Sequence, residues 1–164
     1  MTPLSRLFAA LALAVALLPA ADAGEPVQPI RLQFDPADIL QAVAHRMNVT
    51  LRPEIPLPTI LLQSKTPLAR FQDAIAVQWK FRPPVYSNAY VVARNEIYLM
   101  DDPEYYVRIN RTLDESLAHE FAHYVQVHYL NADLADPSCE SDAIAVQALF
   151  ATPRIAATAG LPQG

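Results

Sequence analysis

Glycine is nearly absent from this 164-residue chain, which contains three, at positions 24, 160 and 164. Loops that cradle phosphate and turns that present a nucleophilic serine need glycine, because the backbone there turns sharply or approaches a ligand closely. The sequence therefore disfavours a P-loop kinase, a dinucleotide-binding fold and an α/β-hydrolase. Fifteen prolines mark the turns instead.

Cysteine and clustered positive charge are also scarce. Cys139 is the only cysteine, which excludes an intramolecular disulfide. The formal net charge is -5, and no stretch combines Lys and Arg with aromatic residues, so the sequence predicts no nucleic-acid partner and no polybasic membrane contact. With 52% hydrophobic and 18% charged residues, the chain is typical of one folded domain with its own core.

A secretion signal is expected over residues 1–23. Arg6 precedes an apolar run over residues 7–18, and an Ala-Asp-Ala triplet that ends at Ala23 fits the small-residue cleavage rule. The run is too short for a membrane-spanning helix, and no later apolar segment approaches that length. We therefore expect cleavage after Ala23, a single domain over residues 24–164, no membrane span after cleavage, and a periplasmic or extracellular location.

Hydrophobic periodicity and turn residues predict an α+β fold with a small sheet. Arg94 and Asn95 separate two apolar runs and indicate a hairpin, which a turn over residues 101–103 ends. The expected helices cover about 36–48, 67–78, 112–129 and 136–151, and the expected strands cover 59–63, 89–93 and 96–100.

The main chemical motif is His119-Glu120-Phe121-Ala122-His123. Two histidines four residues apart lie about 40° apart around a helix, so both imidazoles project from one face, the arrangement that Zn²⁺ takes from a helix. Glu120 falls close enough to address a water on the metal without being a ligand. Thr112 and Glu115 form a capping box that predicts the start of this helix.

A catalytic zinc site requires a third protein ligand, and three residues downstream are candidates. His128 lies about 140° around the helix from His123, so we expect it to be a surface or packing histidine. Glu140 and Asp142 lie on the final helix, where only one of the two can face the metal. Cys139 is interpreted as a small packing residue.

His119-Glu120-x-x-His123 followed by Glu140-Ser141-Asp142-Ala143 resembles the gluzincin group of zinc metallopeptidases. It is most similar to short bacterial zinc proteases and to the catalytic core of CAAX prenyl protease-like and thermolysin-like enzymes. The resemblance covers about residues 86–150 and implies a zincin-like fold, Glu140 as the third zinc ligand with Asp142 as the alternative, and Ala143 as a point of close helix approach. It also implies one Zn²⁺ per chain and hydrolysis of peptide or protein substrates, with Glu120 as general base.

Two positions depart from that resemblance. Ile144 stands where the related enzymes carry an Asp that supports a zinc-bound histidine, so Asp142 or a backbone carbonyl is expected to serve. The electrophilic helper of the related enzymes is also missing downstream, which leaves three upstream tyrosines as candidates: Tyr90, Tyr105 and Tyr106. The stretch over residues 88–92 resembles the strand that pairs with substrate, and equally an ordinary core strand.

The sequence thus predicts an exported zinc metallopeptidase. Two alternatives stay open. One is a zinc-binding protein that keeps the fold without turnover, and the other is an envelope interaction protein. The oligomeric state stays open as well.

Overall fold

The computed structural model describes residues 30–151, so the expected leader over residues 1–23 and the segment after Pro153 lie outside the described residues. These residues form an α+β domain with five α-helices and a three-stranded mixed sheet. The elements in chain order are α1 (Pro36–Arg46), β1 (Thr59–Leu62), α2 (Leu68–Trp79), β2 (Ala89–Val91), β3 (Glu96–Leu99), α3 (Pro103–Ile109), α4 (Leu113–Leu130) and α5 (Pro137–Gln147). Short 3₁₀ turns cover Gln63–Lys65, Val92–Arg94 and Ala148–Phe150.

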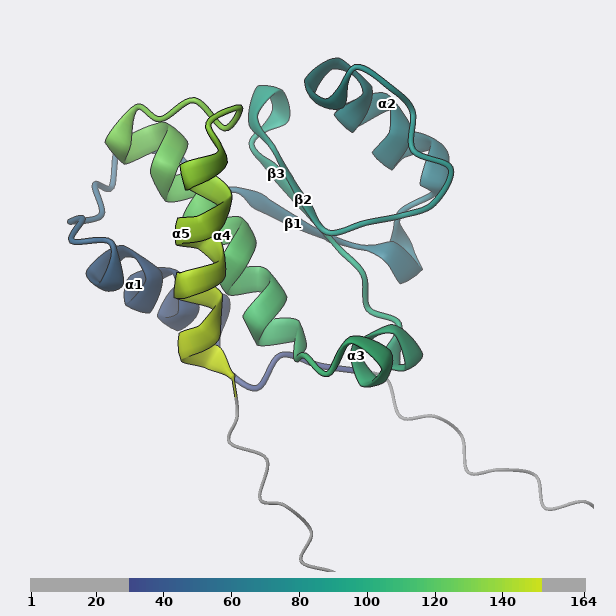
Figure 1. The fold of residues 1–164 in the computed structure, drawn as a ribbon, viewed down its shortest axis with the longest axis horizontal. Coiled ribbons are helices and arrows are strands. Elements are labelled where there is room, and N and C mark those ends of the chain that lie inside the picture. The colour runs from purple at the N-terminus through teal and green to yellow at the C-terminus, as the bar shows by residue number, and fades with distance from the viewer. Residues whose placement is uncertain (1–29, 152–164) are drawn as a thin grey trace, which may run out of the picture.

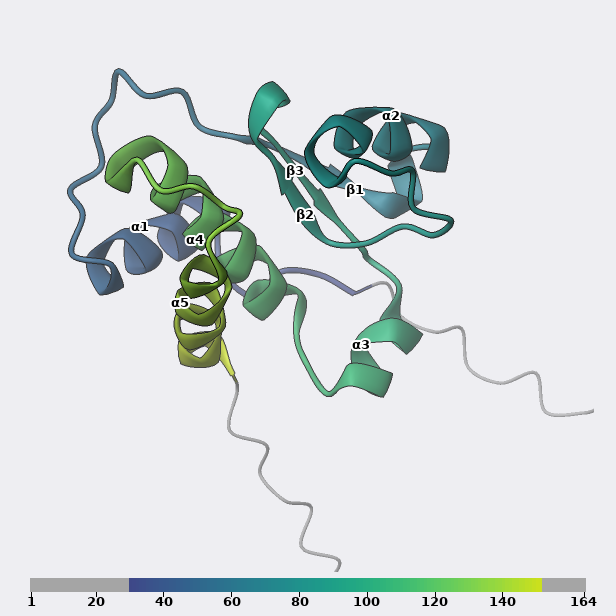
Figure 2. The same ribbon diagram turned by 45° about the horizontal axis from the view of Figure 1, so that its top comes forward.

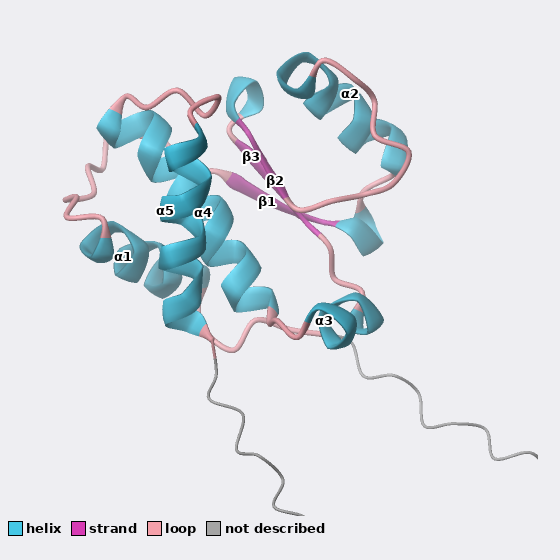
Figure 3. Ribbon diagram, viewed as in Figure 1, coloured by secondary structure: helices cyan, strands magenta, loops and turns pink. Residues whose placement is uncertain are grey.

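The sheet has the strand order β1-β3-β2 and separates two layers of helices (Figure 1). β3 pairs in parallel with β1 and antiparallel with β2, which places β2 at one edge. The view in Figure 2 shows α2 on one side of the sheet and α1, α4 and α5 together on the other. Figure 3 shows how small the sheet is beside the helices that cover it. The domain is therefore a helical layer, a short sheet and a single covering helix.

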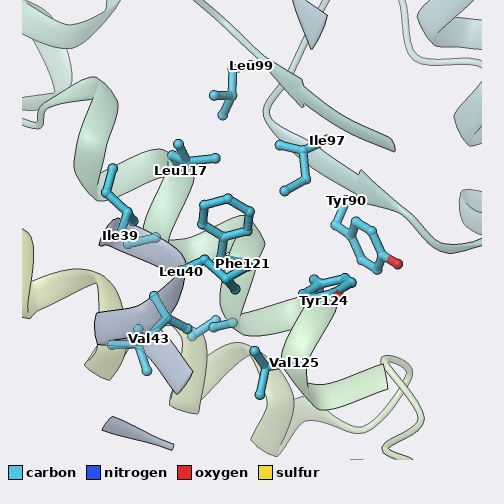
Figure 4. Packing of buried hydrophobic residues seen from close by; sticks show 14 of the residues in the cluster. Ile39, Leu40, Val43, Tyr90, Ile97, Leu99, Leu117, Phe121, Tyr124 and Val125 are labelled. Carbon is cyan, nitrogen blue, oxygen red and sulfur yellow. The ribbon is translucent and has the colours of Figure 1, made fainter. Parts of the chain in front are cut away.

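Alternation along the strands divides the core between the two faces of the sheet. Tyr90 and Ile97 point toward α4 and pack with Phe121, which lies near the middle of the main cluster (Figure 4). Val91 and Tyr98 point the other way and belong to a second cluster under α2. Because α4 packs against the sheet, α1 and α5 at once, it is the central element of the fold.

Helix α4 begins where the sequence predicts it. The Thr112 hydroxyl accepts a hydrogen bond from the Glu115 N–H at 3.1 Å, and the Glu115 carboxylate accepts one from the Thr112 N–H at 2.6 Å. This reciprocal pair satisfies two N–H groups that a helix start otherwise leaves without partners. The helix ends at Asn131, which has a left-handed backbone conformation with φ of 52°.

The first turn of α4 also holds the segment that enters the domain. The buried Asp114 carboxylate accepts hydrogen bonds from the backbone N–H groups of Gln33 and Phe34 at 2.9–3.1 Å. These bonds join positions about eighty residues apart in the chain. The segment before α1 is thereby fixed to the helix that carries the motif.

Several element boundaries differ from expectation. The turn predicted over residues 101–103 does end the hairpin, but a helix that was not predicted follows it, because Asp102 caps α3 by accepting a hydrogen bond from the Glu104 N–H at 2.9 Å. The hairpin was predicted with a two-residue connection, but a 3₁₀ turn over Val92–Arg94 connects the strands, with Asn95 in the left-handed region. The last helix also stops at Gln147 and continues as a short 3₁₀ turn. Among the helices over residues 30–151, none combines the length and the apolar character that a membrane crossing requires.

Candidate metal centre

Two helices bring three potential metal ligands together. His119 and His123 project from one face of α4, and their Nε2 atoms are 3.1 Å apart. Glu140, in the first turn of α5, places one carboxylate oxygen 3.4 Å from His119 Nε2 and the other 3.4 Å from His123 Nε2. The imidazole side chains are 12% and 14% exposed, whereas the Glu140 side chain is 59% exposed. The three groups therefore meet at the wall of a cavity that is open to solvent.

The position of Glu140 follows from how α5 begins. The α4–α5 loop ends at Asp136, whose carboxylate accepts a hydrogen bond from the Ser138 N–H at 2.9 Å and caps the helix. Ala143, one turn later, is completely buried in the same cluster as Ala118 and Ala122 of α4. Small side chains on both helices allow a close approach. That approach carries Glu140 over the two histidines.

The donor atoms have the spacing that tetrahedral zinc requires. Zinc binds imidazole nitrogen and carboxylate oxygen at about 2.0–2.1 Å, so a tetrahedral arrangement separates any two donor atoms by about 3.3–3.4 Å. The separation of the two histidine nitrogens, 3.1 Å, is close to this value, and so is the 3.4 Å from each of them to one oxygen of Glu140, a different carboxylate oxygen in each case. His119, His123 and Glu140 are also a group of metal-binding side chains whose ligand atoms all lie within 4.8 Å of one another. The residues present therefore fit one zinc ion, with the fourth position left for a further ligand.

The environment of these groups favours uncharged imidazole and a protonated carboxyl. Burial lowers the pKa of His119, and the neighbouring His123 adds to the lowering. The neutral ring has the lone pair that a metal requires. Burial also raises the pKa of Glu120 to about 8, against a smaller lowering by a hydrogen bond from the backbone of Tyr90. Glu120 is 4% exposed, lies one residue from His119 and lines the same cavity of about 260 Å³.

Gln126, which the sequence analysis did not single out, orients His123. Its side-chain oxygen lies 2.9 Å from His123 Nδ1, and its side-chain amide donates to the Cys139 carbonyl at 2.8 Å. An acceptor at Nδ1 places the ring proton there and leaves Nε2 free for the metal. Gln126 is 2% exposed and follows His123 by three residues. That helical spacing is the sequence signal that could have identified it.

The supporting group expected on α5 is not where the sequence placed it. Asp142 and Ile144 are both exposed, and Asp142 does not join the group formed by the two histidines and Glu140. The prediction that Asp142 or a backbone carbonyl supports a histidine was therefore wrong for His123. The buried Gln147 amide lies beside His119, whose Nδ1 atom has no partner at direct hydrogen-bond distance among residues 30–151.

The three tyrosines proposed as electrophilic helpers occupy different places. The Tyr90 hydroxyl donates to the Asn95 side chain at 2.9 Å and lies 2.7 Å from His128 Nε2. The buried Tyr106 hydroxyl donates to the Met100 carbonyl at 2.8 Å. Tyr105 lines the polar cavity next to Glu120 and Glu140. Tyr90 and Tyr105 thus line two neighbouring cavities at the site, and the Tyr90 hydroxyl already has partners in the structure.

His128 and Cys139 have the structural roles that the sequence predicts. His128 packs on the Tyr124 ring, with ring centroids 4.9 Å apart, and bonds the Tyr90 hydroxyl rather than the ligand group. Cys139 is buried, its thiol lies 3.4 Å from the Asp133 carbonyl, and burial raises the pKa of that thiol. Neither residue is close enough to join the candidate metal ligands.

The edge of β2 borders the site but is covered at its outer side. The Gln78 side chain, near the end of α2, donates to the Tyr90 carbonyl at 3.0 Å and accepts from the Val92 N–H at 3.1 Å. One amide side chain thus occupies the two main-chain groups that an added peptide strand would use first. The strand expected next to the site is present, but its Tyr90 carbonyl and the Val92 N–H that follows are already bonded to Gln78.

The chain was also compared with known proteins. No protein-family model, no curated protein and no solved structure matches it.

Proposed function

We propose that this protein is an exported zinc-dependent peptidase with a zincin-like arrangement of its two ligand-bearing helices. The observation that carries the proposal is the convergence of His119, His123 and Glu140 at zinc-ligand spacing, with Glu120 buried beside them. Zinc held by His119, His123 and Glu140 would lower the pKa of a bound water to about 7 and would polarise a carbonyl group. The cavity beside these ligands is where the scissile peptide group would lie.

The chain's own residues supply the proton transfers. Glu120 accepts the proton of the attacking water and passes it to the leaving amine as the peptide bond breaks. Its burial suits this role, since a carboxyl with a raised pKa both accepts and releases a proton near neutral pH. Tyr105, which lines the adjoining polar cavity, would donate a hydrogen bond to the carbonyl oxygen as negative charge develops there.

The first experiment measures the zinc content of the purified chain beside His123→Ala. We expect one zinc per chain in the wild type and its loss in His123→Ala. His128→Ala is the matched control, because this histidine lies on the same helix outside the ligand group, and it should retain zinc. A chain that takes up no zinc under reconstituting conditions contradicts the proposal.

Hydrolysis is tested separately with a mixed peptide library and mass spectrometry. Removing a general base costs about 10²–10⁴-fold in rate, so Glu120→Gln should keep its zinc and lose cleavage by at least about a hundredfold. Equal cleavage by the wild type and Glu120→Gln would assign any activity to a contaminant.

A second candidate is a zinc-binding protein that keeps the site without turnover. The observation in its favour is Gln78, which covers the edge of β2 beside the ligands. Zinc binding with no peptide cleavage, in both the wild type and Gln78→Ala, would support this candidate over the peptidase.

A further inference from the structure

Three cavities lie next to one another across the candidate ligands and share lining residues, and we call them together the trough. The cavity of about 260 Å³ at the ligands shares Gln78, Trp79 and Leu134 with a groove of about 570 Å³ between α2 and the α4–α5 loop. In the other direction it adjoins a cavity of about 160 Å³. Those two cavities share four residues: Asn88, His119, Glu120 and Glu140. An extended molecule lying over the ligands therefore reaches both ends of the trough.

The two ends differ in chemistry. The large groove is mainly apolar, with side chains such as Val77, Trp79, Val91, Val127 and Leu134. Apart from the two shared glutamates and His119, the small cavity is lined only by residues with hydroxyl, amide or guanidinium groups. These are Ser87, Asn88, Tyr105, Arg111, Ser116 and Gln147. We name this small cavity the polar end of the trough. Its lining suits a polar group of the substrate rather than an apolar side chain.

Within residues 30–151, Arg111 is the only Arg or Lys that lines the polar end. Its backbone is held between two helix ends, since Asn110 caps α3 in the left-handed region and Thr112 caps α4. The Arg111 N–H also donates to the Tyr106 carbonyl at 3.2 Å. The base of the side chain is thus fixed next to the site, while its charged end is exposed.

The Arg111 guanidinium is available for a ligand. Within residues 30–151 it forms no ion pair, and its side chain makes no hydrogen bond. A guanidinium has five N–H donors in a planar fork that matches the two oxygens of a carboxylate.

We propose that Arg111 binds a carboxylate of the substrate at the polar end, on the first or second residue from the cleaved bond. The proposal rests on the proposed function and specifies its substrate class: peptides with an α-carboxylate or an acidic side chain close to the bond that breaks. The Asn88 amide adds a donor beside the same group. An extended residue spans about 3.3–3.6 Å, so a carboxylate one or two residues away lies within reach of an arginine side chain.

The test measures binding without turnover, using the zinc-loaded full chain with Glu120→Gln. Four short acetylated probes share a Phe and differ in the next residue: Ala with a free carboxylate, Ala amide, Asp amide and Asn amide. The first pair isolates an α-carboxylate and the second pair isolates a side-chain carboxylate. We expect one or both carboxylate probes to bind at least about tenfold more tightly than their neutral partners. The pair that shows the difference identifies the source of the carboxylate.

Arg111→Gln should remove that preference, and Arg111→Lys should restore part of it, because lysine keeps the charge without the fork. Arg108→Gln is the matched control, since Arg108 stacks on Tyr105 with its guanidinium 5.7 Å from the ring centroid but does not line the polar end. It should keep the preference. Equal binding of charged and neutral probes overturns the proposal, and so does a carboxylate preference that survives Arg111→Gln.

Two further outcomes separate this proposal from the proposed function. If Arg111→Gln in the otherwise unchanged chain lowers kcat equally for charged and neutral peptides, Arg111 stabilises the developing oxyanion and does not select carboxylates. If the wild type cleaves no peptide but the binding preference is present and depends on Arg111, the peptidase assignment fails while the carboxylate site stands.

Discussion

At the scale of single residues, the metal centre depends on polar groups that the fold encloses. Glu120 and Gln126 are 4% and 2% exposed, and both lie on α4 beside the candidate ligands. An enclosed polar side chain that lacks partners destabilises a protein by about 1–3 kcal/mol. Gln126 uses both ends of its amide, and Glu120 has the Tyr90 backbone beside it.

Replacing Gln126 should weaken metal binding without unfolding the chain. Gln126→Met keeps the volume but removes the acceptor at His123 Nδ1 and the bond to the Cys139 carbonyl. Loss of such supporting partners costs about 10–100-fold in metal affinity, and we expect that range from competition titration with a zinc chelator. Gln72→Met, on α2 and bonded only to the Pro83 carbonyl, should leave the affinity unchanged. An unchanged affinity in Gln126→Met would contradict the assigned role.

Glu120 should make the metal-free chain less stable as pH rises. Its carboxyl holds a proton up to about pH 8 in the folded chain, whereas the ordinary value is 4.5. The folded state therefore binds more protons between these pH values, so stability is highest below pH 4.5 and falls as pH rises through about 8. The loss is at most about 5 kcal/mol.

Urea unfolding of the metal-free wild type beside Glu120→Gln measures this effect. The stability of the wild type relative to the variant should fall as pH rises from about 4.5 to about 8, because glutamine does not titrate. Two parallel stability curves would show that the Glu120 carboxyl is ionised in the fold at neutral pH.

At the scale of elements, α2 and the edge strand β2 share the cover of the site. The Gln78 side chain forms hydrogen bonds with the Tyr90 carbonyl and the Val92 N–H, the groups that an added peptide strand would use. Trp79 and Leu134 then continue the wall on either side of the gap between α2 and the α4–α5 loop. The end of α2 is thus part of the trough, although no residue of this helix was expected near the site.

Gln78→Ala should free the Tyr90 carbonyl and the Val92 N–H for substrate. Each regained hydrogen bond contributes about 0.5–1.5 kcal/mol, so the two together should raise kcat/KM for extended peptides by at least about fivefold. Gln72→Ala on the same helix is the control and should have no effect. A fall in kcat/KM in Gln78→Ala would mean that this residue helps to build the site rather than to cover it.

Local sequence signals predicted most helix starts and the three candidate ligands. The capping box at Thr112 and the caps at Asp35 and Asp136 were readable because a cap needs only a few neighbouring residues. Two other features depend on tertiary contacts that adjacent residues do not encode. One is the parallel pairing of β1 with β3, and the other is the bond from Gln126 to the Cys139 carbonyl. Asp102-Pro103 had the same signal as Asp35-Pro36 and was overlooked as a turn.

At the scale of the whole molecule, one helix joins the core to the candidate site. Successive faces of α4 contact α1, the sheet and α5, and the metal ligands lie between the contacts with β2 and α5. A change in the packing of α4 therefore affects stability and ligand geometry together.

Phe121 is the residue at which the contribution of α4 packing to stability should be measured. Phe121 lies between His119 and His123 in the sequence. Its side chain is 3% exposed and points into the core between α1 and the sheet (Figure 4). Phe121→Ala should lower the free energy of unfolding by about 3–5 kcal/mol, followed by urea denaturation of the metal-free chain. Val107→Ala, at a side chain on α3 that is 74% exposed, should change it by less than about 0.5 kcal/mol. A small effect at Phe121 would show that the core collapses around the missing ring.

The cover on β2 also has a consequence for the rate of substrate capture. Gln78 is a single side chain, and a side-chain rotamer change takes picoseconds to nanoseconds, whereas lid and domain closure take microseconds or longer. Exposing the strand therefore requires one rotation, with no rearrangement of backbone. In stopped-flow mixing, the observed rate constant of peptide association should increase linearly with peptide concentration. It should reach no plateau, because a plateau would indicate a slow opening step.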